Sequence, residues 1–432
     1  MSRKIIVAGA GHGGIVAGAK LSEAGFDVTV YEARKKENIG HDWHDCLWKP
    51  AFEKAKIPEP ENILPNIPIS YFNPSKSVLI NPDKNKDKPT LGYVDRKEFI
   101  NHLVSFAEKN GVEFVFGTKV TGVICDEDKV TGIKIEKDGV TEDVFADFVI
   151  DAAGIDSPVR RNLPESFGIE NEIKDEDTFF VYRAYYEKKD GFSSLPKYCI
   201  YFCHCKNIGL DWVINDDEFV DVLIGSFGPF KDGVIDNALN DFKSDYEVMG
   251  DKVIRGGQIT KIPLRRVLSR FACNGYAAVG DSAFMTEPLS GSGISLSIRA
   301  GTMLYDAIAN CDCNPFTKEN LWKYESAFLK EYIPSYLNDE YIKNAMVEMG
   351  ADNLDLMFTK KVMGKNELCG GGKLNARSIL QKAKGVITTP AVFPALIHAV
   401  KGIAGIKTLL NTIPEEFDEE KVKEWELKYN QK

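Results

Sequence analysis

A glycine-rich turn between an apolar strand and a helix is the feature that most limits how this chain can fold. Residues 9–14 read Gly-Ala-Gly-His-Gly-Gly, directly after the apolar segment 4–8 and directly before a helix predicted over 15–24. A second predicted strand, 27–31, ends at Glu32. This is the G-x-G-x-x-G fingerprint in the strand, turn and helix context of a dinucleotide-binding βαβ unit. We therefore predict an α/β protein that begins with a Rossmann-type parallel sheet.

Each position of the fingerprint has a physical task. Gly9 permits the tight turn, Gly11 lets the backbone approach a pyrophosphate, and Gly14 allows the helix to pack closely. The N-terminus of the helix offers N–H groups and positive dipole to phosphates. Glu32 can accept hydrogen bonds from ribose hydroxyls and would repel a 2′-phosphate. The motif by itself does not distinguish FAD from NAD.

A second glycine-containing segment favours FAD. Residues 276–281 read as a strand that ends in Gly-Asp, and residues 288–294 (Pro-Leu-Ser-Gly-Ser-Gly-Ile) lead into a helix predicted over 294–309. A carboxylate such as Asp281 can hold the ribityl hydroxyls of a flavin. The N-terminus of the helix would stabilise negative charge at N1 and O2 of the reduced ring. The candidate flavin contacts here are Asp281, Pro288, Gly291, Gly293 and Ile294.

The residue composition and the periodicity of the sequence change between these two segments. Residues 170–262 are rich in Tyr, Phe, Val and Ile and alternate with a period of two, as in 179–187 and 219–227. This pattern predicts an antiparallel sheet inserted between two halves of a nucleotide-binding fold. The predicted domains are the first part of the FAD-binding domain (1–169), a substrate-binding sheet (170–262), the second part of the FAD-binding domain (263–320) and a C-terminal helical region (321–432).

Composition excludes several classes of function. The net charge of -10 disfavours nucleic-acid binding, which needs a basic face. The nine cysteines show no regular spacing, so we expect reduced thiols and a cytoplasmic protein. The apolar segment 386–410 is interrupted by two prolines and two lysines. Core packing is the default for this segment, and a wall of the substrate pocket or a weak contact with a membrane surface are the alternatives.

Four motifs together resemble the geranylgeranyl reductase-like family of FAD-dependent oxidoreductases. They are the opening glycines, Arg96 in Tyr-Val-Asp-Arg, residues 151–160 with Asp-Ala-Ala-Gly, and residues 280–294. The resemblance covers roughly residues 1–330, and the superfamily also contains aromatic monooxygenases and halogenases. It implies that the flavin also contacts Gly13, Arg96, the backbone of Val120 and the residues around Cys46.

The chain also departs from its relatives. Aromatic hydroxylases of this superfamily usually carry a histidine soon after the second flavin-site aspartate, whereas Ser-Ala-Phe follows Asp281 here. Halogenases carry Trp-x-Trp-x-Ile-Pro, and residues 209–215 keep only the second tryptophan and the isoleucine. Geranylgeranyl reductases usually end a related aromatic segment in proline, where this chain has Asn215. These differences leave the substrate open.

Residues 41–46 (His-Asp-Trp-His-Asp-Cys) are the candidate catalytic loop. The resemblance places this loop near the flavin ring, where His44 or Cys46 could supply a proton to a substrate carbon. A metal site or a polar loop without a catalytic role are the alternatives, and a tyrosine within 180–201 is another possible acid. We expect no metal, because no second ligand cluster completes a coordination sphere. The C-x-C pairs at 203–205 and 311–313 are read as incidental.

Three functional hypotheses remain. The preferred one is an FAD-dependent oxidoreductase in which reduced flavin hydrogenates a carbon–carbon double bond of an apolar, prenyl or lipid-like substrate. The others are an FAD-dependent monooxygenase, which needs a dry pocket, and a flavin-binding redox sensor without turnover. The chain has no second G-x-G-x-x-G unit. Electrons must therefore come from transiently bound NAD(P)H or from an electron-carrier protein.

Overall fold

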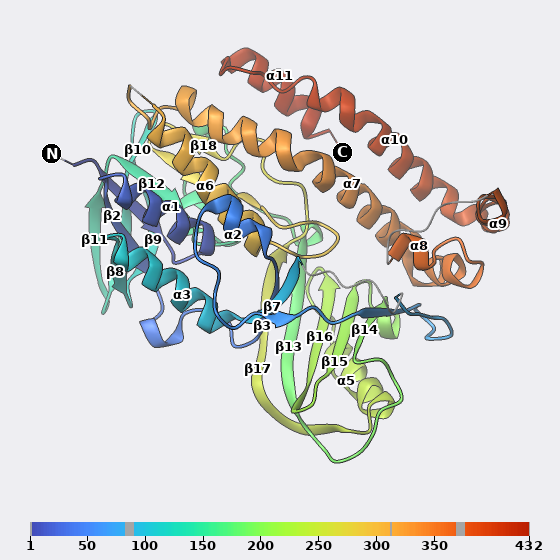
Figure 1. Ribbon diagram of the computed structural model, residues 1–432. Helices are drawn as coiled ribbons and strands as arrows, with labels where there is room; N and C mark the ends of the chain where they lie inside the picture. Colours follow the sequence, from blue (N-terminus) through green and yellow to red (C-terminus); the bar gives the residue numbers. More distant parts are fainter. Residues whose placement is uncertain (1, 83–89, 312, 369–375, 432) are drawn as a thin grey trace.

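The computed structural model describes residues 2–82, 90–311, 313–368 and 376–431. A six-stranded sheet forms the nucleotide-binding part of the protein (Figure 1). Within this sheet, β1 pairs in parallel with β2 and with β12, so the carboxyl ends of these strands meet at one edge. The predicted Rossmann-type α/β sheet is thus confirmed. Its strands, in spatial order, are β18 (Ala272–Cys273), β19 (Tyr276–Ala278), β12 (Phe148–Asp151), β1 (Lys4–Ala8), β2 (Asp27–Glu32) and β8 (Glu113–Phe116).

Three helices pack against this sheet: α1 (His12–Glu23), α3 (Arg96–Lys109) and α6 (Ile294–Ala309). The crossing of α1 and α6 is close, because a Cβ on Gly301 would lie 2.2 Å from the carbonyl oxygen of Gly13. Asp95 caps α3: its side chain accepts hydrogen bonds from two backbone N–H groups of the first turn. The nucleotide-binding part also contains the short helices α2 (Pro50–Ala55) and α4 (Pro158–Arg161).

A three-stranded antiparallel sheet flanks the nucleotide-binding part. It contains β9 (Lys119–Asp126), β10 (Lys129–Lys137) and β11 (Val140–Phe145). Asp138 and Gly139 connect the last two strands with φ values of 51° and 79°. Positive φ at both central positions is the requirement of a type I′ turn, for which Asp-Gly is a favoured sequence.

The second large sheet has seven strands and lies beside the first (Figure 1). In spatial order they are β17 (Met249–Pro263), β13 (Thr178–Lys188), β16 (Phe219–Phe227), β15 (Leu210–Asn215), β14 (Tyr198–Phe202), β5 (Ile69–Phe72) and β6 (Leu79–Ile80). The first five are antiparallel, as predicted, and α5 (Val234–Asp245) packs on one face. β5 pairs in parallel with β14, so this sheet also takes two strands from outside the predicted range 170–262. The domain boundaries stay a prediction.

A small sheet of β3 (His44–Trp48), β7 (Leu91–Asp95) and β4 (Leu64–Pro65) positions the predicted catalytic loop. His44 lies opposite Asp95 in the antiparallel register of β3 and β7. The N–H of Arg96 donates to the carbonyl oxygen of Trp43 (2.9 Å). The loop is therefore held against the start of α3.

Helices form the C-terminal region, as predicted. They are α7 (Lys318–Thr359), α8 (Lys365–Leu368), α9 (Ala376–Ile387), α10 (Phe393–Leu410) and α11 (Glu419–Tyr429). Gly350 interrupts α7 with φ of 68° and ψ of 175°. α10 packs along the outer side of α7, away from the sheets (Figure 1).

Candidate functional site

One large cavity, of about 1500 Å³, lies between the two large sheets. One end is lined by the glycine turn, the end of β2 and the start of α6, and the other end by the seven-stranded sheet and α7. The cavity therefore brings together segments that are far apart in the sequence. The predicted site residues that line it are Gly9, Gly11, Glu32, His44, Cys46, Arg96, Val120, Asp281, Pro288, Gly291, Gly293 and Ile294.

The glycine turn is fixed by its contact with Ala152, which follows β12. Gly9 has φ of +86°, and a Cβ on Gly9 or Gly11 would lie 2.8 or 2.6 Å from the carbonyl oxygen of Ala152. A Cβ on Gly14 would lie 2.5 Å from the Ala152 side chain, and one on Gly13 would lie 2.4 Å from a carbonyl oxygen of α6. Gly13 and Gly14 are not among the residues that line the cavity. These two glycines instead allow α1 to pack closely.

Glu32 both lines the cavity and braces the glycine turn. Its Oε2 accepts a hydrogen bond from the N–H of Ala10 (2.9 Å), and its Oε1 accepts one from the N–H of Arg34 (2.8 Å). The carboxylate is therefore held at the end of β2, beside the turn. This is the place that a ribose-binding acid occupies in a dinucleotide fold.

Asp281 lies in the 3-10 turn Gly280–Ala283, directly after β19. Its Oδ1 accepts a hydrogen bond from the hydroxyl of Thr286 (2.7 Å). Burial raises the pKa of Asp281, whereas Thr286 and the positive charge of Arg96 act in the opposite direction. A cavity-lining carboxylate that is short of hydrogen-bond donors is suited to accept them from a polyol chain.

The N-terminus of α6 opens on the cavity beside Asp281. Its N-cap residue, Gly293, provides no side-chain cap, and Ile294 is the first helical residue. Gly291 has φ of +70° with open space around its Cβ position. First-turn N–H groups without a side-chain cap, at the positive end of the helix dipole, are a site for a partial or full negative charge.

Arg96 is paired rather than solvated. Its guanidinium donates to Oδ2 of Asp45 (2.9 Å), and its side chain is 22% exposed. The pair joins the start of α3 to the predicted catalytic loop at the cavity wall. Val120, on β9, is almost completely buried and also lines the cavity.

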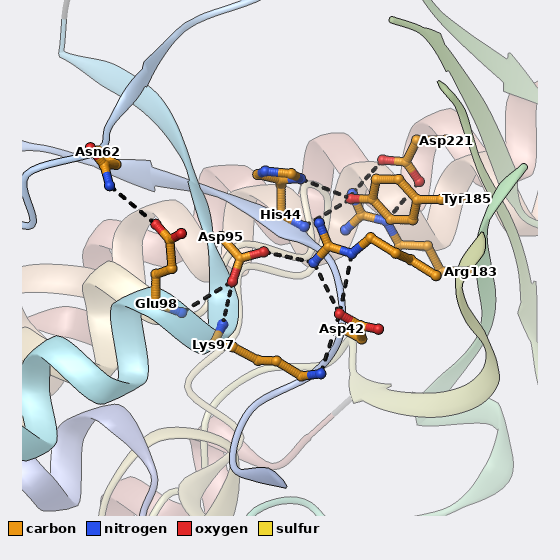
Figure 2. A network of polar contacts seen from close by, with 10 residues as sticks. Asp42, His44, Asn62, Asp95, Lys97, Glu98, Arg183, Tyr185 and Asp221 are labelled. Atoms are coloured by element: carbon orange, nitrogen blue, oxygen red, sulfur yellow. Dashed lines mark hydrogen bonds and ion pairs between the residues drawn. The ribbon is translucent and has the colours of Figure 1, made fainter. Parts of the chain in front are cut away.

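The loop with His44 is fixed by polar contacts to the second sheet (Figure 2). The backbone N–H of His44 donates to the hydroxyl of Tyr185 (2.8 Å), and the His44 Nδ1 lies 3.3 Å from the same oxygen. Arg255 of β17 forms ion pairs with Asp42 and Asp95 (3.1 and 2.6 Å). The loop therefore has one defined position between β7 and β13.

The surroundings of the loop favour the neutral form of both histidines. Burial lowers the pKa of His44, and the charge of Arg255 lowers it further. Burial, with Arg96 and Arg34, lowers the pKa of His41 to about 3. Both shifts run against the protonated imidazole that a general acid needs, so the catalytic role of His44 stays a prediction.

The sequence analysis did not single out the buried pair behind this loop. Arg183 of β13 donates from Nε and Nη2 to the two oxygens of Asp221 on β16 (3.0 and 2.6 Å). The same Nη2 donates to the Tyr185 hydroxyl (3.1 Å). The sequence does carry a signal for this pair, because Arg183 and Asp221 are charged residues within strands that are mainly apolar and aromatic. Tyr185 itself falls within the range 180–201 proposed for an alternative acid.

Two family models match the chain. An FAD binding domain matches residues 80–188, and an NAD(P)-binding Rossmann-like domain matches residues 7–45, which contain the glycine turn. Curated relatives extend these matches over most of the chain. The digeranylgeranylglycerophospholipid reductase of Methanocella arvoryzae is 25% identical over 355 residues (81% of this chain and 88% of the relative). Digeranylgeranylglycerophospholipid reductase 2 of Methanococcoides burtonii is 28% identical over 337 residues (74% and 79%).

The resemblance to the geranylgeranyl reductase-like family is thus supported by relatives that cover most of the chain at 22–28% identity. A solved structure from Thermoplasma acidophilum, described as a geranylgeranyl bacteriochlorophyll reductase-like protein, has a TM-score of 0.73 to it at 21% identity, covering 94% of this chain and 99% of that one. Solved flavin-dependent halogenases, and a structure from Pseudomonas aeruginosa described as a probable FAD-dependent monooxygenase, have a similar fold, with TM-scores of 0.59 to 0.62.

The end of the cavity away from the glycine turn is a mainly apolar chamber. Charged residues, among them Arg183 and Lys343, also line the cavity. The apolar and aromatic wall residues come from the seven-stranded sheet, from α7 and from the segment after it: Phe179, Val181, Tyr198, Ile200, Phe202, Leu210, Trp212, Ile214, Leu223, Met346, Leu354 and Met363. The buried Nε1 of Trp212 has no hydrogen-bond partner among the described residues. An elongated apolar molecule fits such a wall.

Of the two C-x-C pairs, only Cys203 lines the cavity. The Sγ atoms of Cys311 and Cys313 lie 3.1 Å apart near the surface. His204, Cys205 and Asp241 bring three potential ligand atoms within 4.8 Å of one another. In the structure, however, both ring nitrogens of His204 already contact carboxylates, those of Asp211 and Asp241 (2.8 Å each).

Proposed function

We propose that this protein reduces carbon–carbon double bonds of a prenyl lipid or a similar apolar substrate. The observation that carries the proposal is the continuity of the cavity, which joins the glycine turn and the start of α6 to the apolar chamber. Relatives over most of the chain are named digeranylgeranylglycerophospholipid reductases. FAD, once reduced, supplies the hydride for such a reaction.

The polar end of the cavity supports FAD binding by named residues. Gly9 and Gly11 would bring backbone N–H groups to the pyrophosphate, and Glu32 would accept from the ribose. Asp281 would accept from the ribityl hydroxyls. Gly13 and Gly14 would act indirectly, by letting α1 pack against its neighbours.

The ring end of the cofactor would lie at the start of α6. The N–H groups after Gly293, with Pro288, Gly291 and Ile294 around them, would hold the pyrimidine edge through the helix dipole. Arg96, Val120 and Cys46 line the adjacent cavity wall and are the other proposed contacts.

The proposed proton donors remain His44 and Cys46, and the geometry separates their roles. The Tyr185 oxygen accepts from the backbone of His44 and from Arg183, so its own hydrogen is available to His44 Nδ1. This arrangement places the single proton of the neutral imidazole on Nε2. A neutral imidazole is a weak acid, so Cys46 is the better candidate for donating the proton, and His44 would orient the substrate.

Electrons would come from transiently bound NAD(P)H or from a carrier protein, and the protein would work in the cytoplasm. The deciding experiment mixes the reduced holoenzyme anaerobically with a prenyl alkene and, separately, with oxygen. We expect alkene reduction and slow reaction with oxygen. Oxygen-dependent hydroxylation of the substrate would instead identify a monooxygenase, and absence of turnover with every acceptor would identify a redox sensor.

A further inference from the structure

The outer face of α10 is apolar and exposed to solvent. The buried residues of this helix, Ala395, Ala399 and Ile406, lie on one side. On the other side, Phe393, Ile397, Val400 and Ile403 have exposed fractions of 37, 48, 65 and 36%. Their spacing places these four side chains in one row along the helix. We call this row the α10 face.

Core packing, the default expectation for this segment, does not describe α10. Residues 390–410 are long and apolar enough to cross a membrane, yet only 17% of the apolar window is buried. The helix also packs lengthwise on α7 through Ala395 and Ala399. A helix held in this way lies along a surface and does not pass through a bilayer.

The sequence segment that contains the α10 face carries charge opposite to that of the whole chain, although Oε2 of Glu348 on α7 lies 3.2 Å from Nδ1 of His398 on α10. Residues 368–414 contain no aspartate or glutamate, although the chain has a net charge of -10. Within the described structure, Lys384, Lys401 and Lys407 are exposed and form no ion pair. The basic residues of this segment are Lys373, Arg377, Lys382, Lys384, Lys401 and Lys407. An apolar row beside unpaired lysines is the pattern of an interfacial helix on an anionic bilayer.

The α10 face and the apolar chamber lie on opposite sides of α7. Ala345 and Met349 of α7 pack toward α10, whereas Met346 and Leu354 of the same helix line the cavity. A bilayer against the α10 face would therefore lie one helix away from the chamber.

We propose that the α10 face is a docking surface for anionic lipid bilayers. The docking follows from the exposure and charge of α10, whereas its use in delivering a lipid substrate rests on the proposed function. The occupant is the bilayer surface, because a contiguous basic segment on an acidic protein complements anionic headgroups.

Flotation of the holoenzyme with vesicles tests the proposal. We expect strong binding to vesicles of phosphatidylcholine mixed with phosphatidylglycerol, weaker binding to phosphatidylcholine alone, and loss of binding at high salt. Val400→Glu should lower the partition coefficient by about tenfold or more, because it places a charge in the apolar row. Lys401→Glu with Lys407→Glu should have a similar effect on the anionic vesicles only.

Val140→Glu on β11 is the matched control, since Val140 is 58% exposed and receives the same substitution far from α10. It should bind vesicles like the wild type. Equal binding by Val400→Glu, or no flotation of the wild type, would overturn the proposal. A change in sedimentation of Val400→Glu without lipid, with vesicle binding unchanged, would also overturn it by assigning the face to a second copy.

Turnover separates docking from the proposed function. Val400→Glu should reduce a short, water-soluble prenyl alkene at the wild-type rate and should reduce a vesicle-embedded alkene more slowly. If neither alkene is reduced but vesicle binding depends on Val400, the proposed function fails and the docking surface stands. Equal rates of the variant and the wild type on the embedded alkene would overturn the delivery role.

Discussion

Arg183 and Asp221, on the neighbouring strands β13 and β16, form a two-point ion pair that is almost completely buried at the cavity wall. The Arg183 guanidinium also lies near the rings of Trp43 and Trp212, 5.7 and 5.3 Å from their centroids. Trp43 belongs to the predicted catalytic loop, and Trp212 lines the apolar chamber. The pair therefore links the loop to the chamber through one fixed cation.

Asp221→Asn should strongly destabilise the protein. The substitution keeps the shape of the side chain but leaves the buried Arg183 charge without its main partner. We expect the free energy of unfolding to fall by about 3 kcal/mol or more. Chemical denaturation of the holoenzyme measures this change. Asp217→Asn, at an exposed position before β16, is the control and should change it by less than about 0.5 kcal/mol. Equal stabilities of the two variants would contradict the prediction.

Asp281→Ala should remove most of the bound flavin. The change deletes a carboxylate that lines the cavity beside the uncapped start of α6. Losing a charged hydrogen-bond acceptor should weaken FAD affinity by roughly 10- to 100-fold. Flavin absorbance per protein and calorimetric titration with FAD measure the loss. Asp306→Ala, near the other end of the same helix, should retain full flavin content. An unchanged affinity of Asp281→Ala would remove Asp281 from the proposed site.

Cys46→Ser should slow substrate reduction more than His44→Ala does. For the cysteine variant, loss of a proton donor predicts a decrease of about 10²-fold or more. Burial lowers the pKa of His44, which favours the neutral ring at pH 7 and above. Removal of this side chain should therefore leave the shape of the pH profile unchanged in that range. Single-turnover rates across pH test both points. Flavin content and flavin reduction by the donor should stay near normal, and full turnover in both variants would make the loop structural.

Glu325→Gln should change how stability depends on pH. Glu325 of α7 is buried, and its Oε1 accepts from the backbone N–H groups of Phe271 and Ala272. Burial raises its pKa to about 8. The folded state therefore holds a proton that the unfolded chain, with a pKa of about 4.3, releases between these values.

The contribution of this proton to the free energy of unfolding is on the order of a few kcal/mol. The contribution is fully present below about pH 4.3 and is lost as pH rises to about 8. Glu325→Gln keeps the acceptor oxygen and should flatten the decrease in unfolding temperature between these values. Glu319→Gln, at an exposed position on the same helix, should keep the wild-type slope. The prediction fails if both variants show that slope.

Local signals in the sequence were sufficient for much of the fold. The helix at Ile294–Ala309 appears as predicted. The cap of α3 by Asp95 and the turn at Asp138 and Gly139 also follow from signals between near neighbours in the sequence. Capping, turn geometry and periodicity act between residues a few positions apart, so the order of amino acids carries them directly.

Longer-range pairing could not be predicted in this way. β5 lies in a proline-containing segment, yet it pairs with β14, well over a hundred residues later. A strand of four residues with modest periodicity does not specify such a distant partner. Its pairing depends on which strand edge is free after the rest of the sheet has formed.

The order of residues was enough to predict the dinucleotide turn, the second flavin motif and the inserted antiparallel strands, and it contains the acid-free basic segment near the C-terminus. The tertiary structure was needed to show that Gly13 and Gly14 face α6 and Ala152, that Arg183 meets Asp221, and that burial lowers the pKa of His44. It also decided that one side of α10 stays exposed. The physical reason is that burial and electrostatic shifts depend on which segments pack together, and residues distant in sequence supply most of that environment.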